Sequence, residues 1–367
     1  MKDLLLITPP FTQLNTPYPA TAYLKGFLNT KNISSYQIDL GIEAILEIFS
    51  KKGVSEIFNV KPKNLSENAQ RIFALKEEYI KTIDEVIAFL QNKKPTLARQ
   101  ICSMNFLPEA SRFNQLDDME YAFGNMGLQD KAKHLATLYL EDLSDYIVEN
   151  IDENFGFSRY AERLGRSANS FDELYEKLQS DKTFVDNFTL EILEKKLLET
   201  QPKLVCFSVP FPGNLYSAFR CAQHIKNHYP NIKTAFGGGF ANTELRDLKD
   251  KRVFEFFNYI TLDDGELPIE LLFENICHSE QSEESLFKRT FLLENGEIVY
   301  KNNSERHDYK QAEIGTPDYT DLPLDQYISV IEIANPMHSL WSDGRWNKLT
   351  MAHGCYWGKC TFCDISL

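Results

Sequence analysis

The sequence has 367 residues, of which 43% are hydrophobic and 13% aromatic, and its formal net charge is −14. This length and apolar content predict about two or three domains with packed cores and exclude a disordered chain. The acidic balance disfavours nucleic acids and anionic membranes as partners, because both need a basic protein surface.

The sequence also lacks the usual signals for export. It contains no run of about 18 apolar residues, so no transmembrane helix and no membrane partner are expected. The apolar part of the N-terminal stretch MKDLLLITPPF is too short for a signal peptide, and the stretch has no small-residue cleavage site. The seven cysteines are an odd number, which argues against a disulfide framework. We therefore expect a cytoplasmic protein.

The first 41 residues predict a strand, a helix and a second strand. The apolar run 3–8 ends at two prolines, which is typical of a buried strand. Apolar residues recur at helical spacing between Ala20 and Leu28. Residues 34–40 have the pattern of a second strand, and together these elements form one βαβ unit.

Residues 42–200 interrupt this alternation. Apolar stripes at helical spacing run through 72–90 and 135–147, and residues 187–200 have a helical pattern too. The segment shows no strand pattern and no internal repeat. It predicts a large all-helical insertion whose apolar stripes face a core.

The α/β pattern resumes in residues 201–275. A strand over 203–211, a helix over 214–230 and a strand over 232–240 are followed by a strand, a turn and a helix over 257–274. Together with residues 1–41, this segment predicts a Rossmann-like, doubly wound, mainly parallel sheet of five strands.

Sheets of this kind bind ligands beyond the carboxyl ends of their strands. At that edge the sequence places Pro9, Pro10, Ser208, Val209, Gly237, Gly238, Gly239, Asp264, Gly265 and Glu266. The glycine triplet has two interpretations: a tight loop, or a backbone that exposes N–H donors to a ligand. It is neither a nucleotide P-loop nor a GxGxxG motif, because the residues that complete those motifs are missing.

Residues 276–345 predict a linker, a hairpin and a connector. The polar stretch 278–288 is typical of a flexible linker. Asn295 and Gly296 lie between apolar runs and predict a hairpin turn. Residues 315–327 contain two prolines and predict an extended connector.

Three cysteines lie close together near the C-terminus. Cys355, Cys360 and Cys363 have the spacing Cys-x4-Cys-x2-Cys and follow a predicted strand over 347–354. Thiolates at this spacing can converge on a soft metal or an iron–sulfur cluster. Structural zinc with His353 as the fourth ligand is an alternative, and simple burial is another. His224 and His228 also have a metal-like spacing, but a solvated position at a helix end is the interpretation we favour.

The stretch HGCYWGKCTFC resembles the cluster loop of radical S-adenosylmethionine enzymes. In that family a Cys-x3-Cys-x-aromatic-Cys loop follows the first strand of a (β/α) barrel. Phe362 matches the aromatic residue, whereas one extra residue separates Cys355 from Cys360. The stretches YPATAYLKGFL, AFGGGFAN and DDGELPIELL are similar to the cobalamin-binding domain that precedes the barrel in one class of the family, and PDYTDLPLDQY is similar to the connector of that class.

This resemblance implies a function and a set of cofactors. Cys355, Cys360 and Cys363 would hold a 4Fe-4S cluster, with Tyr356 and Phe362 also at the cofactor site. S-adenosylmethionine would bind the open iron and be cleaved reductively to a 5′-deoxyadenosyl radical, for methyl transfer or another radical modification. Cobalamin is a candidate second cofactor, and a flavodoxin or ferredoxin would supply the electron. The substrate is unknown.

The resemblance also implies that the barrel is truncated. A (β/α) barrel needs roughly 200 residues, and residues 346–367 cover only its first strand and cluster loop. We therefore expect the N-terminal part of a larger enzyme, inactive by itself. No histidine precedes His134, so a bound cobalamin would lack a protein histidine ligand from the first strand's loop. The alternative function is a non-catalytic α/β ligand-binding module with a zinc-stabilised tail of three cysteines and one histidine.

Overall fold

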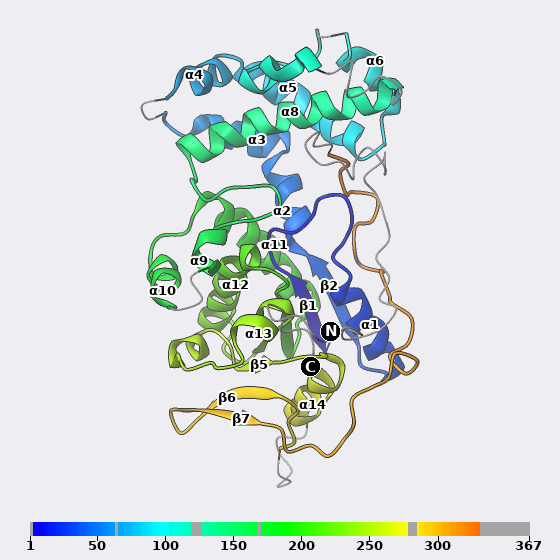
Figure 1. Cartoon of the computed structure of the whole chain (residues 1–367), viewed down its shortest axis with the longest axis vertical. Helices are drawn as coiled ribbons and strands as arrows, with labels where there is room; N and C mark the ends of the chain where they lie inside the picture. Colours follow the sequence, from blue (N-terminus) through cyan, green and yellow to red (C-terminus); the bar gives the residue numbers. More distant parts are fainter. Residues whose placement is uncertain are drawn as a thin grey trace.

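A seven-stranded sheet forms the centre of the computed structural model, which describes residues 3–62, 65–103, 105–118, 127–166, 170–277 and 285–330 (Figure 1). The strand order is β2-β1-β3-β4-β5-β6-β7. The first five strands are parallel, and β6 and β7 are antiparallel additions. The α/β class that the sequence predicts is therefore confirmed. The strands are β1 (Leu4–Thr8), β2 (Ser35–Asp39), β3 (Leu204–Ser208), β4 (Lys233–Gly237), β5 (Tyr259–Thr261), β6 (Thr290–Glu294) and β7 (Glu297–Lys301).

Helices cover both faces of this sheet. Leu4 and Leu6 of β1 pack in one apolar cluster with α1 (Ala20–Thr30) and α14 (Glu266–Cys277). Leu5 and Ile7 face the opposite cluster, which contains residues of α2, α11, α12 and α13. Alternate residues of β1 are thus buried on opposite faces, which explains why the strand is apolar throughout. The helices of this second face are α2 (Leu40–Ile48), α11 (Phe184–Thr200), α12 (Leu215–His228) and α13 (Gly239–Glu244).

The segment between β2 and β3 contains helices and no strand in the residues that the structure describes, as the sequence predicts. In Figure 1 its middle part forms a separate helical layer at one end of the molecule, whereas α2 and α11 lie beside the sheet. None of the described helices is long and apolar enough to cross a membrane. The remaining helices are α3 (Lys51–Asn59), α4 (Glu67–Ala74), α5 (Lys76–Leu90), α6 (Ala98–Ile101), α8 (Gly127–Asn150), α9 (Glu162–Arg166) and α10 (Asp172–Gln179).

The predicted hairpin is confirmed as β6 and β7. Asn295 has φ 51° and Gly296 has φ 77°, as a two-residue turn between antiparallel strands requires. β6 pairs with β5, so the hairpin extends the central sheet. The sequence predicts the hairpin itself but not its pairing with β5, because strand pairing between distant segments leaves no local signal.

The connector runs across α1 as an extended strap, defined here as residues 315–330 (Figure 1). A Cβ on Gly26 of α1 would lie 2.1 Å from the carbonyl oxygen of Thr316, so only glycine permits this close approach. The ammonium group of Lys25 donates to the hydroxyl of Thr320 and forms an ion pair with Asp321. The strap is therefore fixed to α1 by both backbone contact and charge.

The far end of the strap is anchored at the start of α2. The carboxylate of Asp39 caps α2 by accepting from the N–H groups of Gly41 (3.0 Å) and Ile42 (3.3 Å). It also accepts from the Tyr327 hydroxyl at 2.8 Å. Burial raises the pKa of Asp39 to about 6, while these three hydrogen bonds act in the opposite direction. Asp39 thus links the sheet, the helical segment and the strap.

The raised pKa of Asp39 predicts how stability depends on pH. The folded protein takes up this proton at about pH 6, whereas the unfolded chain does so near the ordinary value of 3.8. Stability therefore rises as pH falls between these values. Asn at this position keeps the cap and cannot ionise. We expect Asp39→Asn to gain about 2 kcal/mol over wild type at pH 7 and to lose that advantage by pH 4, measured by urea denaturation.

A second variant tests the strap contact itself. Tyr327→Phe removes a hydrogen bond that lowers the pKa of Asp39, so the pH at which stability begins to rise should move above 6. An Asp39→Asn advantage that is equal at pH 7 and pH 4 would contradict this interpretation of the buried carboxyl group.

Candidate functional site

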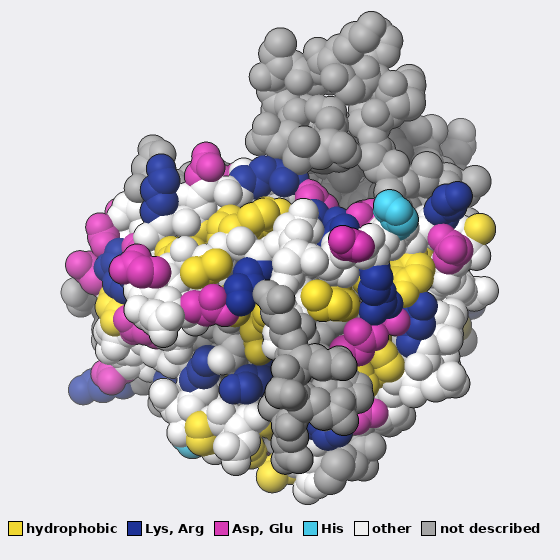
Figure 2. Space-filling model, turned by 90° about the horizontal axis from the view of Figure 1, so that it is seen from below, with side chains coloured by type: hydrophobic (Ala, Val, Ile, Leu, Met, Phe, Trp, Pro, Cys, Tyr) yellow, Lys and Arg dark blue, Asp and Glu magenta, His cyan; other side chains and the backbone are white. Residues whose placement is uncertain are grey.

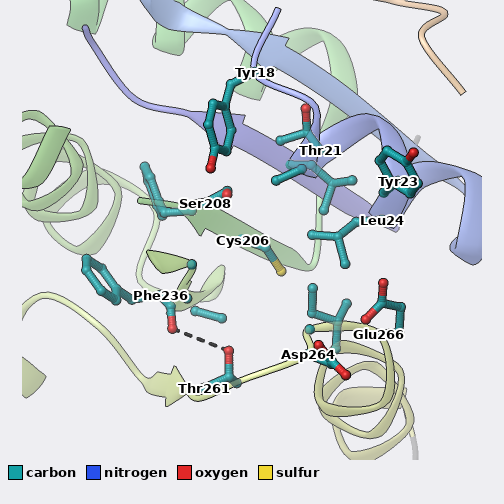
Figure 3. Close-up of a pocket in the computed structure, with 18 of the residues that line it drawn as sticks. Tyr18, Thr21, Tyr23, Leu24, Cys206, Ser208, Phe236, Thr261, Asp264 and Glu266 are labelled. Atoms are coloured by element: carbon teal, nitrogen blue, oxygen red, sulfur yellow. Dashed lines mark hydrogen bonds between the residues drawn. The ribbon is translucent and has the colours of Figure 1, made fainter. Parts of the chain in front are cut away.

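A pocket of about 260 Å³ lies at the carboxyl ends of the parallel strands (Figure 3). Its walls come from the first turns of α1 and α14 and from the last residues of β3, β4 and β5. α1 is the next element after β1 in the chain, and α14 is the next element after β5. Each helix therefore begins at the edge where its strand ends. The pocket therefore forms at the edge where the sequence predicts a ligand.

The floor of the pocket is apolar. Leu6, Cys206 and Ala235 contribute it from three adjacent strands, and Leu24 and Ile269 close it from α1 and α14. These residues belong to or pack against the cluster between the sheet and the two helices. Burial raises the pKa of the Cys206 thiol to about 12, so it stays protonated and unreactive at neutral pH. The floor suits a flat, apolar ring.

The rim is polar and acidic. Asp263, Asp264 and Glu266 contribute carboxylates, and Tyr18 and Ser208 contribute hydroxyl groups. Glu266 lies in the first turn of α14, where the positive end of the helix dipole favours a carboxylate. No lysine or arginine is among the described residues that line the pocket. The rim therefore suits a neutral or cationic group that carries hydrogen-bond donors.

The acidic loop is held rigidly from both sides. Asp263 has φ 62°, in the left-handed region, and its N–H donates to Asn242 Oδ1 at 2.7 Å. Arg246 Nη2 lies 2.5 Å from Asp263 Oδ1, and Arg289 Nε lies 3.5 Å from Asp263 Oδ2. Arg289 also donates to the carbonyl oxygen of Asp264 at 3.1 Å. Asp263 thus positions the loop, and the Asp264 side chain lies at the pocket (Figure 3).

The glycine triplet is explained largely by packing. Gly238 has φ 103°, and a Cβ there would lie 2.8 Å from the carbonyl oxygen of Val209. The Val209 N–H donates to Gly237 at 2.8 Å, and the Phe240 N–H donates to Val209 at 3.0 Å. A Cβ on Gly239 would also lie within 2.7 Å of this neighbouring loop. Gly237 and Gly238 line the pocket, but the tight-loop interpretation accounts for the glycines by itself.

The other predicted residues divide into two groups. Ser208, Asp264, Gly265 and Glu266 line the pocket, whereas Pro9, Pro10, Val209 and Gly239 do not. The carbonyl oxygen of Pro9 instead accepts a hydrogen bond from the side-chain amide of Asn214 at 2.8 Å. The wall that sequence reasoning missed comes from residues 18–21, Tyr23 and Leu24. Its helical periodicity was visible, but periodicity does not indicate which turn of a helix borders a pocket.

The predicted metal ligands lie outside the described residues. These are Cys355, Cys360 and Cys363, with the alternative ligand His353 and the neighbours Tyr356 and Phe362. The described parts of the chain contain no group of three or more His, Cys, Asp or Glu residues that could hold a metal ion.

The histidine pair on α12 differs from the solvated arrangement that the sequence suggested. His224 Nε2 lies 2.6 Å from Glu194 Oε2, and its ring stacks on His228 with a centroid distance of 4.3 Å. Burial lowers the pKa of His224. Only His224 departs from the expected solvated position, because His228 is exposed. His224 is held in a side-chain contact with α11.

A larger cavity of about 680 Å³ lies between α10, α12 and α13. Its lining includes Phe171, Phe219 and Phe240, and also Arg252, which is paired with Asp172 at 2.7 Å. The smaller pocket is the better candidate because polar groups from several strand ends converge on it.

No family model, curated protein or solved structure matches the chain. Its function is therefore inferred from the pocket and from the cysteine spacing.

The glycine contact leads to a stability prediction. Gly238→Ala should lower the free energy of unfolding by about 3 kcal/mol, because it adds a backbone clash to the cost of a left-handed residue. Gly296→Ala is the matched control, since Gly296 also has positive φ but nothing lies within 4 Å of its Cβ. This control should lose only about 1 kcal/mol in chemical denaturation. Equal losses in the two variants would show that the loop contact is unimportant.

Proposed function

We propose that this chain functions as a cobalamin-type radical S-adenosylmethionine enzyme. In this proposal the Rossmann-like domain, residues 1–41 and 201–275, binds one end of cobalamin at the pocket of Figure 3. The observation that carries the proposal is the position of the pocket at the carboxyl edge of a parallel sheet. The cysteine spacing supports the radical chemistry independently.

The strand order explains why this edge is a suitable binding position. From β1 the chain crosses to β2 on one side, whereas from β3 it crosses to β4 on the other side. The connecting helices α1 and α12 therefore lie on opposite faces of the sheet. Loops that diverge in this way leave a crevice between adjacent strands, where open α/β sheets bind ligands.

The residues present fit one end of cobalamin. At about 260 Å³, the pocket is slightly smaller than the about 300–1,000 Å³ typical of sites for whole drug-sized ligands. It has room for one heteroaromatic ring and its sugar, which leaves the corrin outside. The apolar floor would hold the ring, and Ser208, Asp264 and Glu266 would accept hydrogen bonds from sugar hydroxyls. The acidic rim would keep the phosphate outside the pocket.

The pocket would act by binding and orienting the cofactor. No histidine is among the described residues that line it, so it offers no histidine ligand to cobalt. When bound, cobalamin supplies a methyl group for transfer, and a 4Fe-4S cluster with S-adenosylmethionine supplies a radical. In this proposal Cys355, Cys360 and Cys363 hold that cluster. A flavodoxin or ferredoxin is the proposed electron donor.

Cobalamin binding can be tested by filling the pocket. A Cβ on Gly265 would meet only side-chain ends, Leu24 Cδ2 at 3.3 Å and Ile269 Cδ1 at 3.7 Å. Gly265→Leu should therefore fold normally and fill the cavity. We expect wild type to retain hydroxocobalamin in equilibrium dialysis and Gly265→Leu to bind it at least about tenfold more weakly, a loss of about 1.4 kcal/mol.

The control for this experiment is Gln100→Leu, which adds the same side chain at an exposed position of α6. It should bind as wild type does, and all three proteins should unfold at similar temperatures. Absence of hydroxocobalamin retention by folded wild-type protein would refute cobalamin binding at this pocket.

Metal content tests the assignment of the cysteines as cluster ligands. It also distinguishes a radical enzyme from the alternative, a non-catalytic ligand-binding module. Anaerobic reconstitution should load about four irons and four sulfides per chain, and Cys360→Ala should lose most of both. Cys277→Ala is the matched control, because Cys277 is a free, exposed cysteine at the end of α14. It should load as wild type does. One zinc without acid-labile sulfide would instead support the non-catalytic module with a zinc-stabilised tail.

A further inference from the structure

The two edges of the central sheet differ in how they are covered. At one edge, the Gln37 side chain of β2 donates to the carbonyl oxygens of Asp318 (2.6 Å) and Thr320 (2.7 Å), so the strap lies beside this strand. At the other edge, β7 pairs with β6 on its inner side, and no described strand pairs with its outer side. An open strand edge is a template for pairing with another chain.

The register of the hairpin shows which backbone groups face outward. Glu294 pairs with Glu297 across a two-residue turn, and such a closing pair is hydrogen-bonded within the hairpin. Hydrogen-bonded and non-hydrogen-bonded pairs alternate in antiparallel strands. The N–H and C=O groups of Ile298 and Tyr300 therefore point away from β6, whereas those of Val299 point toward it.

The side chains of β7 favour association as well. Tyr300 is 47% exposed and Leu293 of β6 is 42% exposed, and both lie on the face of the hairpin that carries Ile298. The strand has the sequence EIVYK, with an acidic residue at one end and a basic residue at the other. Figure 2 shows the end of the molecule where the hairpin lies, with hydrophobic side chains among charges of both signs. This surface is not dominated by one charge.

We propose that β7 pairs with β7 of a second copy of this chain, antiparallel and centred on Val299. In this register Ile298 lies opposite Tyr300 of the second copy, so outward-facing backbone groups meet each other. Glu297 lies opposite Lys301 of the second copy, and the symmetry repeats that pair. Any other register would leave at least one of these charges opposite a different residue. A second copy is favoured because the strand is complementary to itself.

The charges of β7 already have partners within one chain, but they remain accessible. Lys251 Nζ lies 2.7 Å from Glu297 Oε1, and Lys301 Nζ lies 2.5 Å from Glu294 Oε1. The side chain of Glu297 is 73% exposed, so its second oxygen can accept from another lysine. The two chains would form one continuous sheet, with Leu293, Ile298 and Tyr300 of both copies on one face. This inference does not depend on the proposed cofactors.

Disulfide trapping tests the register directly. In Val299→Cys, the two introduced cysteines would face each other as a non-hydrogen-bonded pair about 4.5 Å apart at Cα, which is compatible with a disulfide. We expect mild oxidation of the full-length chain to give a covalent dimer whose linked peptides both contain position 299. In the control Glu297→Cys, the same residues would be about 13 Å apart and should not link. Mass spectrometry distinguishes these bonds from those of the native cysteines.

Charge reversal tests the pairing without oxidation. Glu297→Lys alone and Lys301→Glu alone would each place like charges opposite each other twice, and should weaken dimerisation about tenfold. The double variant restores opposite charges across the axis and should recover dimerisation, although it disrupts the pairs within each chain. Light scattering during size-exclusion chromatography measures each mass.

Each of three results would overturn the proposal. One is a wild-type chain that stays monomeric at about 100 μM with no disulfide through position 299. Another is a dimer in which the double variant dissociates as much as each single variant does. The third is a dimer that forms without the disulfide at position 299, which would show that the chains associate through another surface.

Discussion

The candidate site depends on the close backbone approach between the loops that follow β3 and β4. Gly238 brings its own loop within hydrogen-bonding distance of Val209, and no other residue type fits there without strain. This contact closes one side of the strand ends. On the other side, Gly237 and Gly238 border the pocket between α1 and α14. This packing constraint thus positions two of the residues that line the pocket.

The pocket is also held in a fixed shape before any ligand binds. The Arg246 and Arg289 side chains hold Asp263 in a left-handed conformation, and Arg289 comes from the segment that leads into β6. The hairpin therefore supports the acidic rim as well as extending the sheet. A rim held in this way reduces the ordering cost of binding and keeps its carboxylates at the pocket. Its charge favours hydroxyl-bearing or cationic groups and opposes an anion inside the cavity.

The local elements could be predicted from the sequence, whereas their long-range contacts could not. Short-range patterns of apolar spacing and turn chemistry predict the strand before Pro9, the helix from Ala20 and the turn at Asn295. The contact of Asp39 with Tyr327 joins residues far apart in the chain, and no local pattern indicates it. The same limit applies to the wall that segment 18–24 contributes. The glycine triplet was ambiguous because tight packing and ligand contact need the same residue type.

The strap supports the helix that forms one wall of the candidate site. The strap crosses α1, whose first turn lines the pocket, and reaches Asp39 at the end of β2. Its contacts with Lys25 and Gly26 fix the position of that helix relative to the sheet. A chain segment outside the parallel sheet therefore contributes to the geometry of the site.

Hydrogen–deuterium exchange of the full-length chain, with and without hydroxocobalamin, is the most direct test of this central claim. We predict that the ligand slows exchange in the segments that line the small pocket and leaves exchange unchanged around the larger cavity. Slower exchange confined to the larger cavity, or no change in any segment, would contradict the account. The segments expected to gain protection are 18–24, 206–208, 235–238 and 261–269.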